Sequence, residues 1–196
     1  MRHLHPCTKE PRGPLWLGLV LLAGGLLLLA VLLTGCASSV SAGPFVEASG
    51  GLGYESPSAG VDMVVERPGF RASAALSTAR KAGSDKAGGA ELRVLAGKDY
   101  DRFGLYAGLR GFAQRFDSGT VEGSNPTLAA YWRVGVRARL WLLYDGPDST
   151  IHDTQALRLE GEMGDQLIFV PACEYVYFDG GHDGWGCSAA LRWRLR

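Results

Sequence analysis

The stretch that decides the fold is CSAALRWRL, residues 187–195, in which apolar residues alternate with small or charged ones. The same alternation runs through WRVGVRARL (132–140) and LRLEGEM (157–163). Successive side chains of a β-strand point to opposite faces, so alternation over such lengths predicts strands with one apolar and one polar face. The sequence therefore predicts an all-β protein.

Clusters of Gly, Pro, Asp and Ser separate such runs and divide the chain after residue 44 into nine candidate strands. Barrels of bacterial membranes usually have an even number of strands. Because the break at Gly164-Asp165 is the weakest, we expect a single antiparallel up-and-down β-barrel of about eight strands, with ten as the alternative. The candidate strands are 45–54, 61–67, 70–79, 91–97, 103–115, 129–144, 155–163, 167–178 and 185–195.

The polar face of these strands is poor in lysine. Only three lysines follow residue 36, and all lie in predicted turns or at their edges. Arginine, which is present instead, pairs with carboxylates in fixed geometry and suits a crowded interior, and an eight-stranded barrel is just wide enough for side chains to fill it. We therefore expect a lumen charge network, with a solvated charged face as the alternative. Its predicted members are Arg133, Arg137, Arg139, Glu160, Glu162, Arg192 and Arg194.

The first residues are typical of an export signal. A positively charged lead over 1–14 precedes an apolar run, Leu15 to Leu33, and then Thr34-Gly35-Cys36. The tetrapeptide LTGC resembles the lipobox of bacterial lipoproteins, which implies that the chain is cut before Cys36 and that this cysteine carries a lipid. A membrane-spanning anchor is the alternative, because 19 apolar residues nearly suffice to cross a bilayer. The expected domains are a signal peptide (1–35), a lipidated tether (36–43) and a β-barrel (44–196).

Removal of residues 1–35 leaves 161 residues, the size of one domain, with a formal net charge of −2. Nothing in this balance points to a nucleic-acid partner, and no motif predicts a cofactor or a metal site. Two further cysteines, Cys173 and Cys187, lie at equal distance from Gly180. If a hairpin loop is centred there, they are cross-strand neighbours that can form a disulfide, with free thiols as the alternative.

Aromatic residues gather near the ends of the predicted strands, where the girdles of membrane barrels would place them; core aromatics are the alternative. With this pattern, the chain after Cys36 resembles the small outer-membrane β-barrels of Gram-negative bacteria. The resemblance implies a lipid-anchored component of the outer membrane that contacts membrane lipid and has a structural or surface-interaction role. It names no protein partner.

Two other functions stay open. One is a soluble periplasmic barrel that is anchored by the lipid and binds an apolar ligand. This function requires an apolar cavity and a polar exterior. An outer-membrane lipid-modifying enzyme could use His182-Asp183 with Ser188 nearby. A nucleophile and its base need hydrogen-bond reach and a third orienting group, and no known motif matches here, so we expect no catalytic residue.

Overall fold

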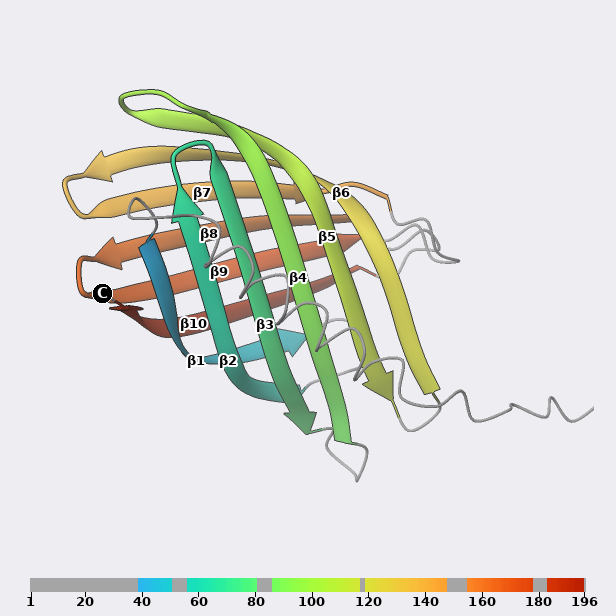
Figure 1. The fold of residues 1–196 in the computed structure, drawn as a ribbon. Helices are drawn as coiled ribbons and strands as arrows, with labels where there is room; N and C mark the ends of the chain where they lie inside the picture. The colour runs from blue at the N-terminus through green and yellow to red at the C-terminus, as the bar shows by residue number, and fades with distance from the viewer. Residues whose placement is uncertain are drawn as a thin grey trace, which may run out of the picture.

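The computed structural model describes residues 39–50, 56–80, 86–116, 119–147, 155–177 and 183–195. Over these ranges the chain forms ten antiparallel strands that close into a barrel, because β1 pairs with β10 as well as with β2 (Figure 1). The predicted all-β, up-and-down barrel is confirmed. The strands are β1 (Ser39–Gly50), β2 (Ser56–Arg67), β3 (Phe70–Arg80), β4 (Lys86–Asp99), β5 (Phe103–Phe116), β6 (Gly119–Gly135), β7 (Ala138–Asp145), β8 (Gln155–Gly164), β9 (Leu167–Tyr177) and β10 (Gly184–Leu195).

The preferred count of eight strands is wrong, and ten is correct. The run WRVGVRARL does not form one strand, because the chain turns at Val136-Arg137 after an irregular register between Arg133 and Gly135. The break at Gly164 is a real turn, in which this glycine adopts a φ of 125° that other residues rarely take. Because apolar residues continue to alternate with charged or small ones through the β6–β7 turn, the pattern did not distinguish this hairpin from a single strand.

The two ends of the barrel differ in the length of their connections. At what we call the turn end, β2–β3, β4–β5, β6–β7 and β8–β9 are joined by two or three residues. At the opposite, loop end, four of the five connections have five to nine residues. Because the number of strands is even, the start of β1 and the end of β10 both lie at the turn end, where Figure 1 marks the C-terminus.

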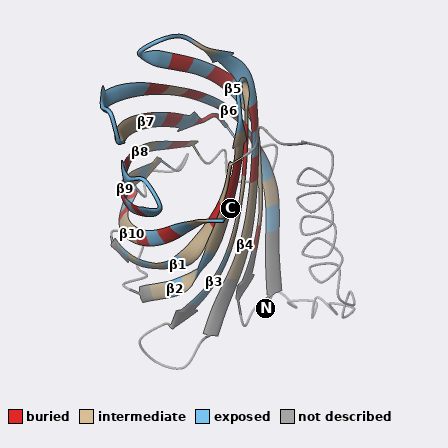
Figure 2. Cartoon of the chain, turned by 60° about the vertical axis from the view of Figure 1, so that its left-hand side comes forward, coloured by how far each residue is buried: buried red, intermediate tan, exposed pale blue. Residues whose placement is uncertain are grey.

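The alternation of the sequence becomes an apolar exterior and a charged interior. Leucines such as Leu109 and Leu128 are 64% and 60% exposed on the outer wall. The inward arginines and glutamates in the middle of the barrel are buried or half-buried. Figure 2 shows buried and exposed residues alternating along several strands, for example β7 and β10. This arrangement is the reverse of a water-soluble barrel, in which the outward face is polar.

Several expectations fall on residues before Ser39. Strand β1 begins at Ser39, five residues earlier than the expected start of the barrel at residue 44. The predicted signal peptide and Cys36 lie outside the described residues. Within the described part of the chain, no helix has the length and apolar character needed to cross a membrane.

Candidate functional site

The middle of the lumen is closed by a set of ion pairs centred on Arg71 of β3. Its guanidinium donates to Glu160 at 2.8 Å, to Glu162 at 2.9 Å and to Glu66 at 2.6 Å. Glu160 and Glu162 stand on β8, and four strands separate β3 from β8 in either direction around the ring. These contacts therefore cross the full width of the barrel.

Beside the ion pairs of Arg71, a further ion pair joins two other opposite strands, β7 and β2. Arg139 of β7 donates to Glu66 of β2 at 2.7 Å and also lies 2.7 Å from Glu162, its neighbour in register on β8. The indole of Trp141 donates to Glu162 at 3.1 Å, and the guanidinium of Arg71 lies 4.3 Å from the centre of a Trp141 ring. The indole ring of Trp141 thus packs among the charged groups in the lumen.

Arg192 of β10 completes this set. Its Nε donates to Asp62 at 2.7 Å, and its Nη1 lies 3.4 Å from Glu162. Three arginines thus meet four carboxylates at one level of the lumen, and the pairs share partners rather than forming separate bridges. We call this set the ionic layer: Asp62, Glu66, Arg71, Arg139, Glu160, Glu162 and Arg192.

A second group lies between the ionic layer and the loop end. Arg93 and Arg110 are directly opposite each other in the register of β4 and β5. Two like charges in this position repel, but both guanidinium groups donate to the same oxygen of Asp145, at 2.7 and 3.1 Å. The hydroxyl of Thr127 donates to the other oxygen of Asp145, at 2.5 Å. Asp145 is 1% exposed and so acts as a buried counter-ion for two arginines.

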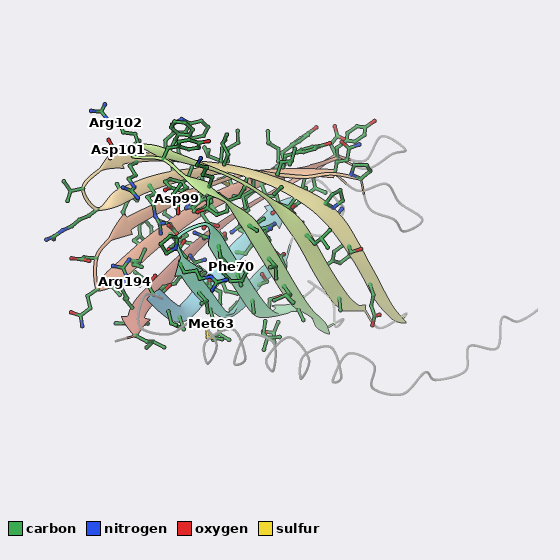
Figure 3. All side chains as sticks on the ribbon, turned by 45° about the horizontal axis from the view of Figure 1, so that its top comes forward. Met63, Phe70, Asp99, Asp101, Arg102 and Arg194 are labelled. Atoms are coloured by element: carbon green, nitrogen blue, oxygen red, sulfur yellow. A yellow bond between two sulfur atoms is a disulfide. The ribbon has the colours of Figure 1, made fainter. Side chains whose placement is uncertain are left out.

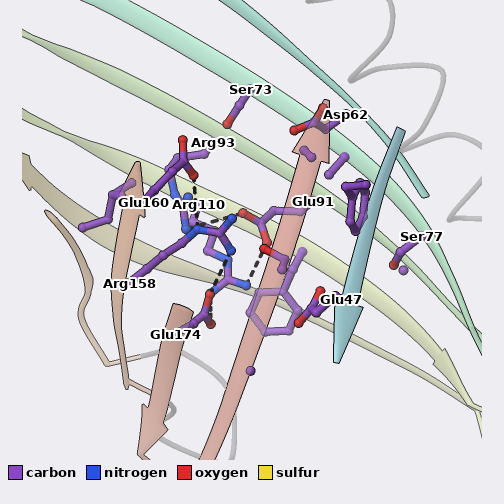
Figure 4. Close-up of a pocket in the computed structure, with 18 of the residues that line it drawn as sticks. Glu47, Asp62, Ser73, Ser77, Glu91, Arg93, Arg110, Arg158, Glu160 and Glu174 are labelled. Carbon is purple, nitrogen blue, oxygen red and sulfur yellow. Dashed lines mark hydrogen bonds and ion pairs between the residues drawn. The ribbon is translucent and has the colours of Figure 1, made fainter. Parts of the chain in front are cut away.

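The same group extends to the opposite wall (Figure 4). Arg110 donates to Glu91 at 2.8 Å and lies 3.7 Å from Glu174 of β9. Arg158 pairs with Glu174 at 3.4 Å and with Glu160 of the ionic layer at 3.3 Å. We call Glu91, Arg93, Arg110, Asp145, Arg158 and Glu174 the loop-side cluster; through Glu160 it is continuous with the ionic layer.

The ionic layer separates two cavities. The loop-side cavity has a volume of about 400 Å³, and the turn-side cavity about 330 Å³. Members of the layer that line the loop-side cavity are Asp62, Arg71, Glu160 and Arg192. Those that line the turn-side cavity are Glu66, Arg139 and Glu162. A single layer of side chains therefore stands between the two hollow halves of the lumen.

The predicted network is partly assembled. Arg139, Glu160, Glu162 and Arg192 lie in the ionic layer. Arg194 lies at the turn-end mouth of the lumen and pairs with Asp165 at 3.2 Å. Arg133 and Arg137 also line the turn-side cavity, but they lie at its mouth and outside the ionic layer. Both are exposed beside the β6–β7 turn, where the chain reverses, and Arg137 lies 3.9 Å from Asp165.

Sequence reasoning missed the arginines of the earlier strands, although their signal was available. Arg71, Arg93 and Arg110 each have an apolar residue immediately before them and apolar or small residues after them in an alternating run, as Arg192 does. Applying the same rule to β3, β4 and β5 would have placed them in the lumen. What no local pattern contains is the partner of Arg71 on the opposite wall.

The two cysteines after Cys36 form a disulfide. Cys173 and Cys187 are register partners on β9 and β10, and their Cα atoms lie 4.1 Å apart. Both stand in the outward phase of their strands. The bridge therefore ties the last hairpin on the outer wall near the loop end.

The residues considered for catalysis are not brought together in the described part of the chain. Ser188 lines the loop-side cavity, and the Tyr175 hydroxyl donates to the carboxylate of Asp183. His182 lies outside the described residues. Within those ranges, no group of three or more His, Cys, Asp or Glu side chains is placed to hold a metal ion.

No protein-family model matches this chain, and no curated protein matches it significantly. Among solved structures it resembles the KdgM porin, at 13% identity over 82% of this chain and 100% of that one, with a TM-score of 0.44. The beta domain of the Bordetella autotransporter BrkA is 16% identical over 80% of this chain and 99% of that domain, with a TM-score of 0.43.

A third is the anion-selective porin from Comamonas acidovorans, 15% identical over 71% of this chain, with a TM-score of 0.39. This chain covers 49% of that porin, about half of its length. At these identities and TM-scores the likeness concerns the fold alone, so function is argued below from this chain's own side chains.

Proposed function

We propose that this protein is a lipid-anchored β-barrel of the outer membrane, with a closed lumen and a structural or surface-interaction role. The observation that carries the proposal is the apolar exterior around a charged interior. A contiguous apolar surface of this kind would be exposed to water at great cost in a soluble protein, whereas lipid chains solvate it. Outward aliphatic side chains occur on most strands, among them Val46, Val61, Leu76, Val94, Leu105, Leu109, Leu128, Leu142, Leu157, Leu159 and Leu191.

Exposed aromatic residues form two belts that flank this apolar band. On β10, Trp185 and Trp193 lie eight residues apart, which corresponds to about 27 Å along a strand. On a strand tilted by about 40° this spans roughly 20 Å of membrane, near the apolar band of about 25 Å in such barrels. The loop-end belt is Tyr144, Tyr175, Tyr177 and Trp185; the turn-end belt is Tyr100, Phe103, Trp132 and Trp193.

Strand length also fits a crossing. A tilted strand needs about 9–11 residues to cross the bilayer, and nine of the ten strands have ten or more. Strands β2 and β4, for which the sequence predicted only 61–67 and 91–97, have 12 and 14 residues. The barrel can therefore reach from one aromatic belt to the other around most of its circumference.

The closed lumen favours a scaffold over a channel. A barrel of ten strands is wider than one of eight, since diameter grows with strand number. Long arginine and glutamate side chains bridge the extra width in the ionic layer, where Arg71 and Glu160 are 7% and 5% exposed. A solute would have to break these buried ion pairs to pass.

The position of Cys36 is consistent with lipid anchoring at the turn end. Short turns of bacterial outer-membrane barrels face the periplasm. Cys36 precedes the first residue of β1 by three positions, so its Cα can lie at most about 11 Å from that of Ser39. A lipid on Cys36 would therefore enter the leaflet at the turn end, beside the closing pair of β1 and β10.

The alternative functions find less support. An anchored soluble barrel that binds an apolar ligand needs an apolar cavity, but the loop-side cavity contains five arginines. A lipid-modifying enzyme needs its nucleophile at the membrane-facing surface, whereas Ser188 lines that cavity. We therefore propose that the protein has no enzymatic activity of its own.

The Cys36→Ser variant separates a spanning barrel from an anchored soluble one. We expect the wild-type protein to incorporate labelled fatty acid and the variant to lose the label. Both should remain in the outer-membrane fraction after alkaline extraction, and both should migrate faster on gels when unheated. Release of the variant into the periplasmic soluble fraction would contradict the membrane-spanning proposal, and labelling of the variant would contradict the assignment of Cys36.

A further inference from the structure

Two neighbouring hairpin turns at the turn end place cations over aromatic rings. The guanidinium of Arg67 lies 5.1 Å from the centre of the Phe70 ring, at the β2–β3 turn. At the β4–β5 turn, the ammonium of Lys98 lies 5.5 Å from the Tyr100 ring, which stacks on Phe103 with centres 4.6 Å apart. We call Arg67, Phe70, Lys98, Tyr100, Arg102 and Phe103 the basic–aromatic patch.

The two turns are held together as one unit. The Gly97 N–H donates to the Gly69 carbonyl at 2.9 Å, and the Gly69 N–H donates to Asp99 at 2.9 Å. The other oxygen of Asp99 accepts from the hydroxyls of Tyr106 and Tyr131. Asp99, which lies between the two turns, is therefore engaged by neutral donors, and the two hairpins present their outward side chains in a fixed relation.

The cations of the patch are not neutralised by the protein. Within the described ranges, Arg67, Lys98 and Arg102 form no ion pair with a carboxylate, although all three are exposed. The rim arginines Arg137 and Arg194 differ, because both lie within ion-pair distance of Asp165. Figure 3 shows Asp101 and Arg102 together at the tip of the β4–β5 hairpin, where Asp101 is the only exposed acid among residues 98–102.

Two of the cations, Arg67 and Lys98, face the outer wall. Arg67 is the register partner of Phe70, which precedes the inward Arg71 by one residue, and Lys98 is the register partner of the outward Leu105. On a membrane barrel, side chains at this height meet the boundary between acyl chains and headgroups. Aromatic rings are enriched at that boundary, and basic side chains are attracted to anionic lipid there.

We propose that the basic–aromatic patch binds the phosphate headgroups of anionic phospholipids in the leaflet at the turn end. This inference rests on the proposed membrane-spanning function and names the lipid class that the barrel selects. The rings of Tyr100 and Phe103 pack against the upper acyl chain, while Arg67, Lys98 and Arg102 contact the phosphate. With Asp101 beside them, these three cations still leave a net positive charge on the patch, which supplies the preference for a headgroup of net negative charge.

Tryptophan quenching tests this preference directly. Trp132 is the register partner of Phe103 and so reports on lipid beside the patch. In a reporter variant, Trp16, Trp185 and Trp193 are replaced by Phe, which leaves Trp132 and the buried lumen residue Trp141. The reporter is reconstituted in phosphatidylcholine vesicles that contain either brominated phosphatidylglycerol or brominated phosphatidylcholine, and quenching gives the relative binding of the two lipids.

We expect phosphatidylglycerol to be preferred beside Trp132 by at least about fivefold, since each basic residue near an anionic surface contributes about that factor. Replacing Arg67, Lys98 and Arg102 by Gln should reduce the ratio to about one. The charge-preserving variant, Arg67→Lys with Arg102→Lys, should keep it. A second reporter, in which Trp16, Trp132 and Trp193 are replaced by Phe, leaves Trp185 at the loop end together with the buried Trp141, and should show a ratio near one.

Each other outcome is informative. Equal quenching by both brominated lipids at Trp132 would show that the barrel is inserted and that the patch has no preference, which overturns this inference and leaves the membrane-spanning proposal intact. A preference that persists in the triple Gln variant would also overturn it. Quenching by neither lipid would show that the barrel is not in the bilayer, and both proposals would fail.

Discussion

Arg71 of β3 and Glu160 of β8 stand on opposite walls of the barrel, yet their side chains approach to 2.8 Å. Four strands separate them in either direction around the ring. The contact therefore fixes the distance across the lumen rather than the spacing of neighbouring strands. Arg139 and Glu66 repeat the relationship between β7 and β2, at 2.7 Å.

Replacing Arg71 by Met should lower stability strongly. The substitution keeps an unbranched, flexible side chain but leaves three carboxylates without their shared cation, and breaking a buried ion pair on one side costs about 3–5 kcal/mol. The free energy of unfolding in lipid vesicles, followed by tryptophan fluorescence in urea, measures the effect. Arg137→Met is the matched control, because this arginine is 71% exposed and 3.9 Å from its partner, and it should change stability by less than about 0.5 kcal/mol. Equal losses in the two variants would contradict the role of the ionic layer.

Removing the cross-lumen bridges should open a water-filled passage. The charge-balanced variant Glu66→Ser, Arg71→Ser, Arg139→Ser, Glu162→Ser deletes the side chains that separate the two cavities. In planar bilayers we expect stepwise ion conductance from this variant and none from the wild-type protein. The double variant Arg158→Ser, Glu174→Ser removes an ion pair between adjacent strands and leaves the layer in place, so it should remain closed. Wild-type conductance of equal size would show that another route crosses the barrel.

A charge on the outer wall distinguishes a membrane barrel from a soluble one. Leu109 lies within β5 and is 64% exposed. In lipid, Leu109→Arg should destabilise the barrel by about 2–4 kcal/mol, because a charge at mid-membrane depth loses its hydration. Val136→Arg, at the tip of the β6–β7 turn, should cost at most about 1 kcal/mol. In a soluble barrel, the Leu109 substitution would be harmless; unfolding titrations that show no difference between the two variants would therefore contradict the proposed location.

The disulfide should stabilise the last hairpin. Cys173 and Cys187 are 14 residues apart in sequence, and closing a loop of that size in the unfolded chain contributes about 3 kcal/mol. The double variant Cys173→Ala, Cys187→Ala should lose about that much, measured as the shift in urea midpoint. Reductant should shift the wild-type midpoint in the same direction and leave the variant unchanged. Identical electrophoretic mobility of the wild-type protein with and without reductant would contradict the bridge.

The sequence predicted contacts between neighbouring strands of the lumen and missed the ion pairs between opposite strands. Arg139 and Glu162 could be placed together because they lie on consecutive strands joined by a connection. The pairing of Cys173 with Cys187 followed from their symmetry about Gly180. Arg133 and Arg137 line the mouth of the lumen and not the ionic layer, also for a local reason. Gly and Val alternate with Arg through the β6–β7 turn, so periodicity alone could not mark where the chain reverses.

By itself, the sequence determined that this chain forms antiparallel strands with one apolar and one charged face. Successive side chains of a strand point to opposite faces, so the alternation of residue types fixes the character of each face. Only the tertiary structure decided that ten strands close the ring and that β3 therefore faces β8. A partner on the opposite wall depends on the number, register and closure of all the strands between, and no single segment contains that information. The ionic layer of Arg71, Glu160 and Glu162 exists because the ring closes at the width their side chains can bridge.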